Sequence, residues 1–323
     1  MSANHMLAAV LAGPRTLELR EVPRPRPAAD QVCIKVEGCG VCGSNGPPWQ
    51  GRPWFDYPMA PGVPGHEGWG VIEEVGGQVR GLAPGDRVAF LSGNALAEYD
   101  VAAEGAVVRL PAALDGQPFP GEPFGCALNV FARSDLRPGH NVAVIGVGFI
   151  GAVLVALART AGARVVAVSR RPFARDLARR LGAELTLEPG PDPRATVEAV
   201  RDHQGGALCD RVIEAVGLQE PLDLAGQLTA ERGRLVIAGY HQDGPRQVDM
   251  QLWNWRGLDV INAHERDPAV YTAGVRAAVD AVVSGRLDPA PLLTHRFPLA
   301  RAAEAFVAQE ERPEGFLKAL VTM

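Results

Sequence analysis

A glycine run between an apolar strand and an alanine-rich helix restricts the fold more than any other stretch of this chain. Residues 142–145 are apolar, residues 150–161 have the composition of a helix, and between them lies a G-x-G-x-x-G pattern made of Gly146, Val147, Gly148, Phe149, Ile150 and Gly151. In this context the first glycine permits a tight turn, the second lets the backbone approach a pyrophosphate, and the third lets the helix pack on the strand. The N–H groups that open the helix would face the phosphates. The run predicts a dinucleotide site; the alternative is three turn glycines in an α/β protein that binds no nucleotide.

The rest of the chain has two parts with different sequence patterns, and the pattern changes near residue 139. From there on, apolar runs alternate with helical stretches, which is typical of a parallel, doubly wound sheet. The first third is instead rich in glycine and proline and has short alternating runs, which indicates an irregular, mainly β body. We therefore expect an α/β fold with two domains: residues 128–263 as a Rossmann domain, and residues 1–127 with 264–323 as a second, mainly β domain. The expected strands are 141–145, 164–168, 211–216, 234–238, 258–262 and 316–321, and the expected helices are 150–161, 172–181 and 270–284.

The end of the second predicted strand of the Rossmann domain bears on the choice of nucleotide. A site for NAD usually places an acidic residue there, which binds the adenosine ribose. Here Ser169 is followed by Arg170 and Arg171, and guanidinium groups suit a 2′-phosphate. This favours NADP over NAD; the alternative is that both arginines are solvated residues at a helix start. Ala215, Val216 and Gly239, which lie at or just after later strands, complete the expected cofactor-binding residues.

Charge and cysteine content exclude several classes of partner. The net charge of −5 gives no electrostatic case for nucleic acid or an anionic membrane. Five cysteines spread along 323 residues do not form a disulfide pattern, and no segment has the length of a membrane span or the pattern of a targeting signal. We expect a cytoplasmic protein that acts on a small molecule.

Potential metal ligands cluster in the first domain. Cys42 is followed by Ser44 and Asn45, and about two dozen residues later His66 and Glu67 follow Gly65. Thiolate, imidazole and carboxylate form the ligand set of catalytic zinc, which keeps one position open. Read alone, this spacing is only suggestive, because a single histidine in a glycine-rich turn is more often structural.

Together these motifs resemble the zinc-dependent medium-chain dehydrogenase/reductase superfamily. The resemblance rests on the run 42–45, on Gly65-His66-Glu67 with the glycines behind it, on 84–88, 121–124, 146–151 and 214–217, and on 298–306. It implies a GroES-like catalytic domain beside the Rossmann domain. It also implies one catalytic Zn²⁺ bound by Cys42, His66 and one or both of Glu67 and Glu122, and Ser44 as the group that accepts the alcohol proton. Cys126, four residues after Glu122, is a further candidate ligand.

The chain departs from the family pattern at three places. The four-cysteine lobe that holds a structural zinc in many members is missing, so one metal per chain is expected. Asn45 stands where an aspartate is usual, although its amide oxygen could still accept an imidazole N–H. Pro47 stands near the position of a relay histidine in several members, which leaves the proton route beyond Ser44 unassigned.

The expected function is hydride transfer between a secondary alcohol, such as a polyol, sugar or cyclitol, and NADP, in a homodimer or homotetramer. Trp49, Trp54 and Tyr57 in the loop 47–64 could stack on a sugar ring or could anchor the loop in the core. His264 is a further candidate pocket residue. Two alternative functions remain. One is a zinc-free quinone or enoyl reductase, which would lack the Cys42, His66 and Glu67 set; the other is a non-catalytic nicotinamide-nucleotide-binding protein.

Overall fold

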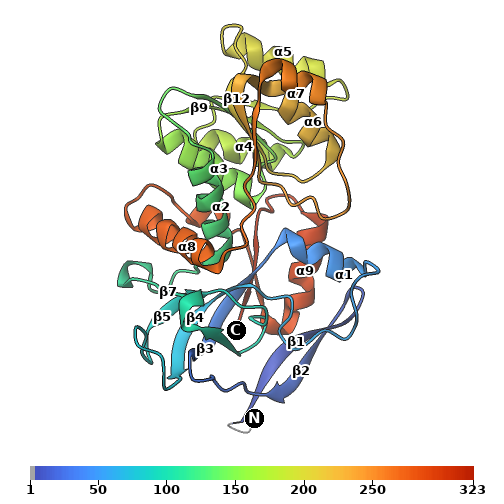
Figure 1. Ribbon diagram of the computed structural model, residues 1–323. Helices are drawn as coiled ribbons and strands as arrows, with labels where there is room; N and C mark the ends of the chain where they lie inside the picture. The colour runs from blue at the N-terminus through green and yellow to red at the C-terminus, as the bar shows by residue number, and fades with distance from the viewer. Residues whose placement is uncertain (1–3) are drawn as a thin grey trace. The chain divides into compact units, whose positions relative to one another are not determined.

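The computed structural model describes residues 4–323, so the first three residues of the expected mainly β domain lie outside the described part. The chain forms two compact units (Figure 1). The first comprises Met1–Gly125 and Asp267–Met323, and the second comprises Cys126–Arg266. We describe each unit by itself.

The second unit is built on a six-stranded parallel sheet with the strand order β10-β9-β8-β11-β12-β13. This is the doubly wound arrangement in which the order reverses beside β8, and it confirms the predicted Rossmann sheet. The strands are β8 (Asn141–Ile145), β9 (Arg164–Val168), β10 (Leu185–Leu187), β11 (Cys209–Glu214), β12 (Thr229–Ile237) and β13 (Asp259–Asn262). The helices are α3 (Phe149–Thr160), α4 (Pro172–Arg180), α5 (Pro193–His203), α6 (Gln219–Leu228) and α7 (Met250–Arg256).

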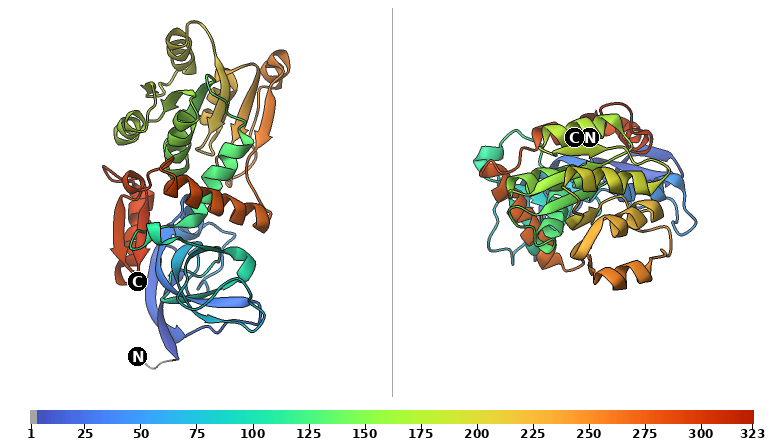
Figure 2. Two further views of the ribbon diagram at one scale, coloured as in Figure 1. Left: turned by 90° about the vertical axis from the view of Figure 1, so that its left-hand side faces the viewer. Right: turned by 90° about the horizontal axis from the view of Figure 1, so that it is seen from above.

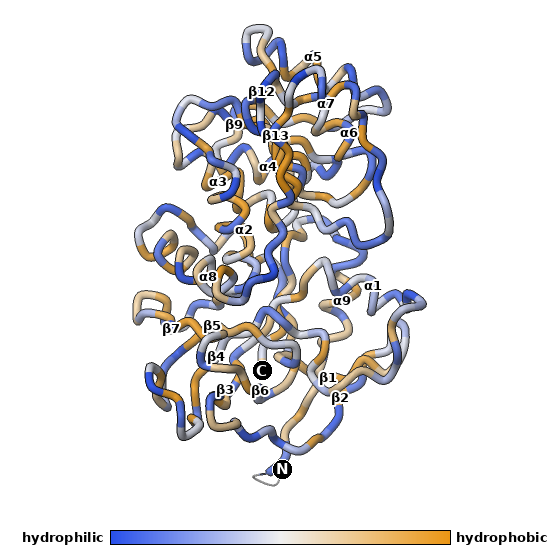
Figure 3. The backbone as a smooth tube through the Cα atoms, in the orientation of Figure 1, coloured by the Kyte–Doolittle hydropathy of each residue, from blue (hydrophilic) through white to orange (hydrophobic). Residues whose placement is uncertain are grey.

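Apolar strands explain why this sheet is covered on both faces. Val142–Val144 of β8 and Val165–Ala167 of β9 are almost completely buried, as expected for parallel strands that carry helices on each side. α3 contacts α4, and α5 contacts α6, so the helices form two layers around the sheet (Figure 2). Hydrophobic residues follow the central strands of this unit and hydrophilic residues its outer turns (Figure 3).

The first unit is mainly β. Its larger sheet has the order β14-β15-β3-β4-β5-β7, with β6 also paired to β3, and β1 and β2 form a separate hairpin. The pairing is antiparallel except between β14 and β15. The strands are β1 (His5–Gly13), β2 (Thr16–Pro23), β3 (Gln31–Val41), β4 (Glu67–Val75), β5 (Arg87–Phe90), β6 (Tyr99–Ala103), β7 (Val107–Arg109), β14 (His295–Pro298) and β15 (Ala319–Thr322).

Helices complete this unit. α9 contacts β15, β14, β3 and α1, and α8 contacts β7. The helices are α1 (Gly46–Gln50), α8 (Pro268–Val283) and α9 (Ala302–Glu311), and α2 (Gly121–Arg133) begins in the first unit and ends in the second.

The loop expected at 47–64 begins with a helix, because α1 covers its first residues. Trp49 on this helix is buried; its ring packs against Phe306 at 5.3 Å and its Nε1 donates to Glu310 at 3.0 Å. The Tyr57 hydroxyl donates to the carbonyl of Pro48. These two aromatic residues therefore anchor the segment, and stacking on a sugar ring is wrong for Trp49. Trp54, in contrast, is 57% exposed.

Three strands have bounds that differ from the prediction by more than one residue. β12 begins at Thr229, five residues before the predicted start at 234. β11 starts at Cys209 and ends at Glu214, so Ala215 and Val216 lie beyond the strand. The strand ends there because the Glu214 carboxylate accepts hydrogen bonds from the backbone N–H groups of Val216 and Gly217, which turns the chain. β15 begins at Ala319, and the apolar pair Phe316 and Leu317 is buried before the strand starts. No helix among residues 4–323 is long and apolar enough to cross a membrane.

Candidate functional site

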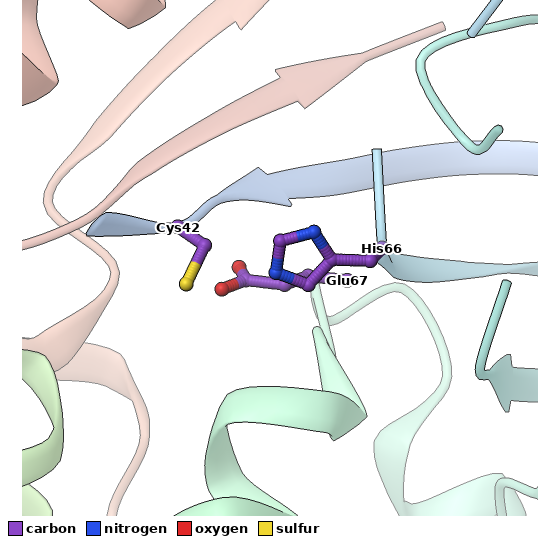
Figure 4. Close-up of side chains that lie close together, drawn as sticks. All are labelled: Cys42, His66 and Glu67. Atoms are coloured by element: carbon purple, nitrogen blue, oxygen red, sulfur yellow. The ribbon is translucent and has the colours of Figure 1, made fainter. Parts of the chain in front are cut away.

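Cys42, His66 and Glu67 come together at one end of the first unit's sheet. Gly40 in β3 pairs with Glu67 in β4, so the end of one strand lies beside the start of the other. Cys42 follows β3 directly, and His66 directly precedes β4. One ligand atom from each side chain lies within 4.8 Å of the others (Figure 4). This spacing suits three atoms around a single metal ion, and thiolate, imidazole and carboxylate are donors that zinc accepts.

A buried lysine stands behind this cluster. Lys318 Nζ donates to Glu67 Oε1 at 2.5 Å, and both side chains are almost completely buried. The same Nζ lies 2.5 Å from Oε2, so the ammonium contacts both oxygens of the carboxylate. A Cβ at Gly40 would lie 1.9 Å from Oε2, so only glycine leaves room for the carboxylate.

Lys318 reaches the cluster because β15 pairs with β3 in an antiparallel register. Burial by itself lowers the pKa of Lys318, but the charges of Glu67 and Cys42 outweigh it and the net shift is upward. The lysine is therefore charged and offsets the buried carboxylate. Lys318 belongs to no motif of the sequence and was not among the predicted site residues. Its rarity was the available signal, because the chain has only two lysines.

The imidazole of His66 is held by its own turn. Its Nδ1 lies 3.0 Å from the carbonyl of Pro64, and this contact requires an Nδ1–H that donates. Nε2 is then the atom with a lone pair for a metal. Ser44 Oγ lies 3.5 Å from Nε2, so the expected proton acceptor is beside the cluster.

The electrostatics of the cluster favour positive charge. Burial opposes charging of the imidazole, but the hydrogen bond and charge of Cys42, together with Glu122 and Glu67, raise the pKa of His66 to about 10. A pocket that stabilises a cationic imidazole to this extent carries a negative potential, which also suits a divalent cation.

Asn45 does not act as the hydrogen-bond partner that we considered for His66. Its side chain is buried, and neither its amide oxygen nor its amide nitrogen has a partner among the described residues. The carbonyl of Pro64 takes the imidazole N–H instead.

Glu122 lies outside the group of three side chains. It is in the first turn of α2, near enough to His66 and Lys318 to raise the pKa of both. It is not within the mutual 4.8 Å grouping of Cys42, His66 and Glu67.

The glycine run in the second unit has the geometry that a pyrophosphate needs. Gly146 follows β8 with φ +92°, a left-handed conformation that favours glycine. A Cβ at Gly151 would lie 1.9 Å from the carbonyl oxygen of Gly146, so the third glycine permits close packing of α3. A Cβ at Gly148 would meet nothing within 4 Å, and Gly148 caps α3. Open space therefore lies over the helix N-terminus, where phosphates bind.

At the expected adenosine end, the arginines differ in placement. Ser169 follows β9 and is largely buried, and Arg170 is exposed. Arg171 donates to the carbonyl of Val147 at 3.2 Å, which holds its guanidinium against the glycine run. Arg175, which the sequence analysis did not single out, donates at 2.8 Å to the carbonyls of Ser169 and Arg170 and so fixes the turn.

The other expected cofactor-binding residues also lie together. The Val216 side chain and the Ala215 backbone pack against Gly146, and a Cβ at Gly239 would lie 2.2 Å from the backbone nitrogen of Gly217. The turns after β11 and β12 thus run side by side next to the glycine run.

Comparisons with known proteins agree with this arrangement. Residues 28–112 match the alcohol dehydrogenase GroES-like domain, and residues 150–280 match the zinc-binding dehydrogenase family. Human sorbitol dehydrogenase is 28% identical over 93% of this chain and 91% of its own length. The 2-dehydro-3-deoxy-L-galactonate 5-dehydrogenase of Pseudoalteromonas atlantica is 25% identical over 98% of both chains.

A solved structure shares the whole fold. A chain from Sinorhizobium meliloti, assigned as a zinc-binding dehydrogenase and bound to NADP, is 28% identical with a TM-score of 0.85 over 99% of both chains. The expected fold class and the expected resemblance are both confirmed. The chain belongs to the zinc-dependent medium-chain dehydrogenase/reductase superfamily of oxidoreductases.

Proposed function

We propose that the protein transfers hydride between a secondary alcohol carbon of a polyol or sugar-derived substrate and a nicotinamide dinucleotide. The observation that carries this proposal is the cluster of Cys42, His66 and Glu67 beside Ser44. Two relatives are named for sorbitol and for a sugar acid as their substrates, and these names support a polyhydroxylated substrate.

The proposed metal is a single Zn²⁺ held by Cys42 and His66, with Glu67 or Glu122 completing the shell. The negative potential at His66 and the mutual grouping of Cys42, His66 and Glu67 support this set. Cys126 is the alternative ligand. The chain has no cysteine between His66 and Glu122, so we expect no structural zinc.

Each protein side chain has a defined part in the proposed reaction. When bound, Zn²⁺ supplies Lewis-acid chemistry that lowers the pKa of an alcohol hydroxyl. Ser44 Oγ would accept the hydroxyl proton while its own hydroxyl proton passes on towards solvent, as the first group of a relay. Pro64 fixes the orientation of His66, and Lys318 keeps the buried carboxylate of Glu67 in place.

We further propose that the cofactor is NADP in preference to NAD. Ser169 brings no negative charge to the adenosine end, while Arg170 is exposed and Arg171 is held beside the glycine run. In this assignment the first unit is the catalytic domain, the second binds the dinucleotide through 146–151, Ala215, Val216 and Gly239, and the active protein is a homodimer or homotetramer.

One experiment tests the proposal and separates the alternatives. A panel of polyols, cyclitols and simple alcohols is assayed with NADP⁺ and with NAD⁺, and the zinc content of the same preparation is measured. We expect turnover on polyols and about one zinc per chain. Turnover of quinones or enoyl compounds without zinc would contradict it, as would cofactor binding without any alcohol oxidation.

A further inference from the structure

Two aromatic side chains stack on each other at the edge of the second unit where the cofactor is expected. Tyr240 lies shortly after β12, and His264 shortly after β13. These strands are parallel neighbours at one end of the sheet, so both residues leave it at the same edge. A dinucleotide spans this carboxyl edge, with adenosine on the β9 side and nicotinamide on the side of β11 and β12.

The ring pair presents an aromatic surface to solvent. The ring centroids of Tyr240 and His264 lie 5.1 Å apart with an interplanar angle of 9°, yet Tyr240 remains 47% exposed. Burial, with a smaller effect of Arg266, lowers the pKa of His264, which keeps its imidazole neutral near pH 7. A neutral imidazole behind a phenol ring leaves a surface rich in π electrons.

A hydrogen-bond chain holds the turn that carries Tyr240. The buried carboxylate of Glu214 lies 3.0 Å from His241 Nε2, and Arg246 Nε donates to His241 Nδ1 at 2.9 Å. Arg246 also donates to the carbonyl of Gly217 at 2.9 Å, which ties the turn after β12 to the turn after β11. Tyr240 is therefore presented by a fixed turn.

Residues 215–217 connect the turn that carries Tyr240 to the glycine run. The Val216 side chain lies where a Cβ of Gly146 would be, 2.4 Å from that position. A Cβ on Gly217 would lie 2.6 Å from the backbone oxygen of Tyr240. The turn 215–217 therefore lies between the phosphate-binding glycines and the backbone of Tyr240.

We propose that Tyr240, backed by His264, is an aromatic wall that contacts the nicotinamide ring and favours its oxidised form. The inference rests on the proposed cofactor. An oxidised nicotinamide carries a positive charge in its ring and a reduced one does not, so a cation–π contribution adds to stacking only for the oxidised form. Loss of the wall should weaken the binding of oxidised cofactor about tenfold and the binding of reduced cofactor about threefold.

Calorimetric titrations of the purified protein test the wall. The ligands are NADP⁺, NADPH and 2′,5′-ADP, with NAD⁺, NADH and ADP in parallel. Tyr240→Leu should change the ratio of the dissociation constants of oxidised and reduced cofactor by about threefold, because the two losses differ. Tyr240→Phe, which keeps the ring, is the matched control and should leave the ratio unchanged. His264→Leu should shift the ratio in the same direction by a smaller factor.

The fragments 2′,5′-ADP and ADP, which lack nicotinamide, distinguish failure of the proposed function from failure of the aromatic-wall proposal. Unchanged affinity of Tyr240→Leu for 2′,5′-ADP or ADP shows that the fold and the adenosine end are intact. If wild-type protein binds neither fragment nor whole cofactor, the proposed function itself is wrong. If the fragment binds normally but Tyr240→Leu binds oxidised and reduced cofactor with unchanged or equally weakened affinity, the aromatic wall is wrong.

Discussion

Replacement of Lys318 by methionine removes the ammonium that lies within hydrogen-bond distance of the buried carboxylate of Glu67. Methionine has nearly the length of the lysine stem and fills the same space, so packing is largely preserved. The carboxylate is fully buried, and its partner ammonium lies 2.5 Å away. Removal of one partner of a buried ion pair typically costs about 3–5 kcal/mol, because the remaining charge is neither paired nor solvated. For a unit of this size, that loss lowers Tm by about 6–20 °C.

The assay is thermal and urea unfolding in the presence of EDTA, so that bound metal does not contribute to stability. Lys35→Met is the matched control, because Lys35 is the other lysine of the chain and is exposed on β3; it should change the free energy of unfolding by less than about 0.5 kcal/mol. The double variant Lys318→Met with Glu67→Gln should recover most of the lost stability, because a neutral amide no longer needs the ammonium.

The pH dependence of this pair has a defined sign. The pKa of Lys318 is raised in the folded protein, so its stabilisation is present below the ordinary lysine pKa of about 10.4 and is lost as the pH rises through the folded value. Wild type and Lys318→Met should therefore converge in stability only in strongly alkaline solution. A Lys318→Met protein as stable as the Lys35→Met control at pH 7 would refute the reasoning.

Three further predictions concern the metal and the cofactor. Cys42→Ser should lose zinc and turnover while Cys126→Ser keeps both, as measured by metal content and initial rate; zinc retained without Cys42 would contradict the proposed ligand set. Gly148→Ala should leave Tm unchanged but weaken cofactor binding at least about tenfold in titrations, because its Cβ meets no protein atom and projects where phosphate should lie. Gly190→Ala, equally unhindered, is its control, and equal affinity of the two variants would count against the phosphate site. Ser169→Asp should shift the ratio of kcat/KM values towards NAD⁺ by about tenfold, since a carboxylate repels a 2′-phosphate; a wild type that already prefers NAD⁺ would remove the basis for this prediction.

The Rossmann sheet could be predicted from sequence because its signals are local. The strands of β8 and β9 match the predicted residues, since each is a short apolar run between polar or glycine residues. The end of β11 could not be predicted in the same way. Ala215 and Val216 continue the apolar run, but the carboxylate of Glu214 binds the N–H groups beyond it and ends the strand. A hydrophobic pattern in the sequence does not reveal these two hydrogen bonds.

The helix at 46–50 was missed for a related reason. Two prolines and a glycine in five residues indicate a loop, yet proline is tolerated in the first turn of a helix. The segment is held by long-range contacts of Trp49 with Phe306 and Glu310, about 260 residues away in sequence. Tertiary packing, which propensity does not include, decides its conformation.

Lys318 shows how a site can depend on a residue that no motif marks. Cys42, His66 and Glu67 were found because their order along the chain resembles a family pattern, but the cation that balances Glu67 arrives from the last strand through its pairing with β3. Without Lys318, the buried carboxylate of Glu67 would stand unpaired beside Cys42 and His66, which would destabilise the fold in the absence of metal. With it, the ammonium lies 2.5 Å from both oxygens of Glu67 and holds the carboxylate beside the other two side chains. The position of Glu67 is therefore fixed before a metal binds, and Gly40 is required because any side chain there would displace the Oε2 atom.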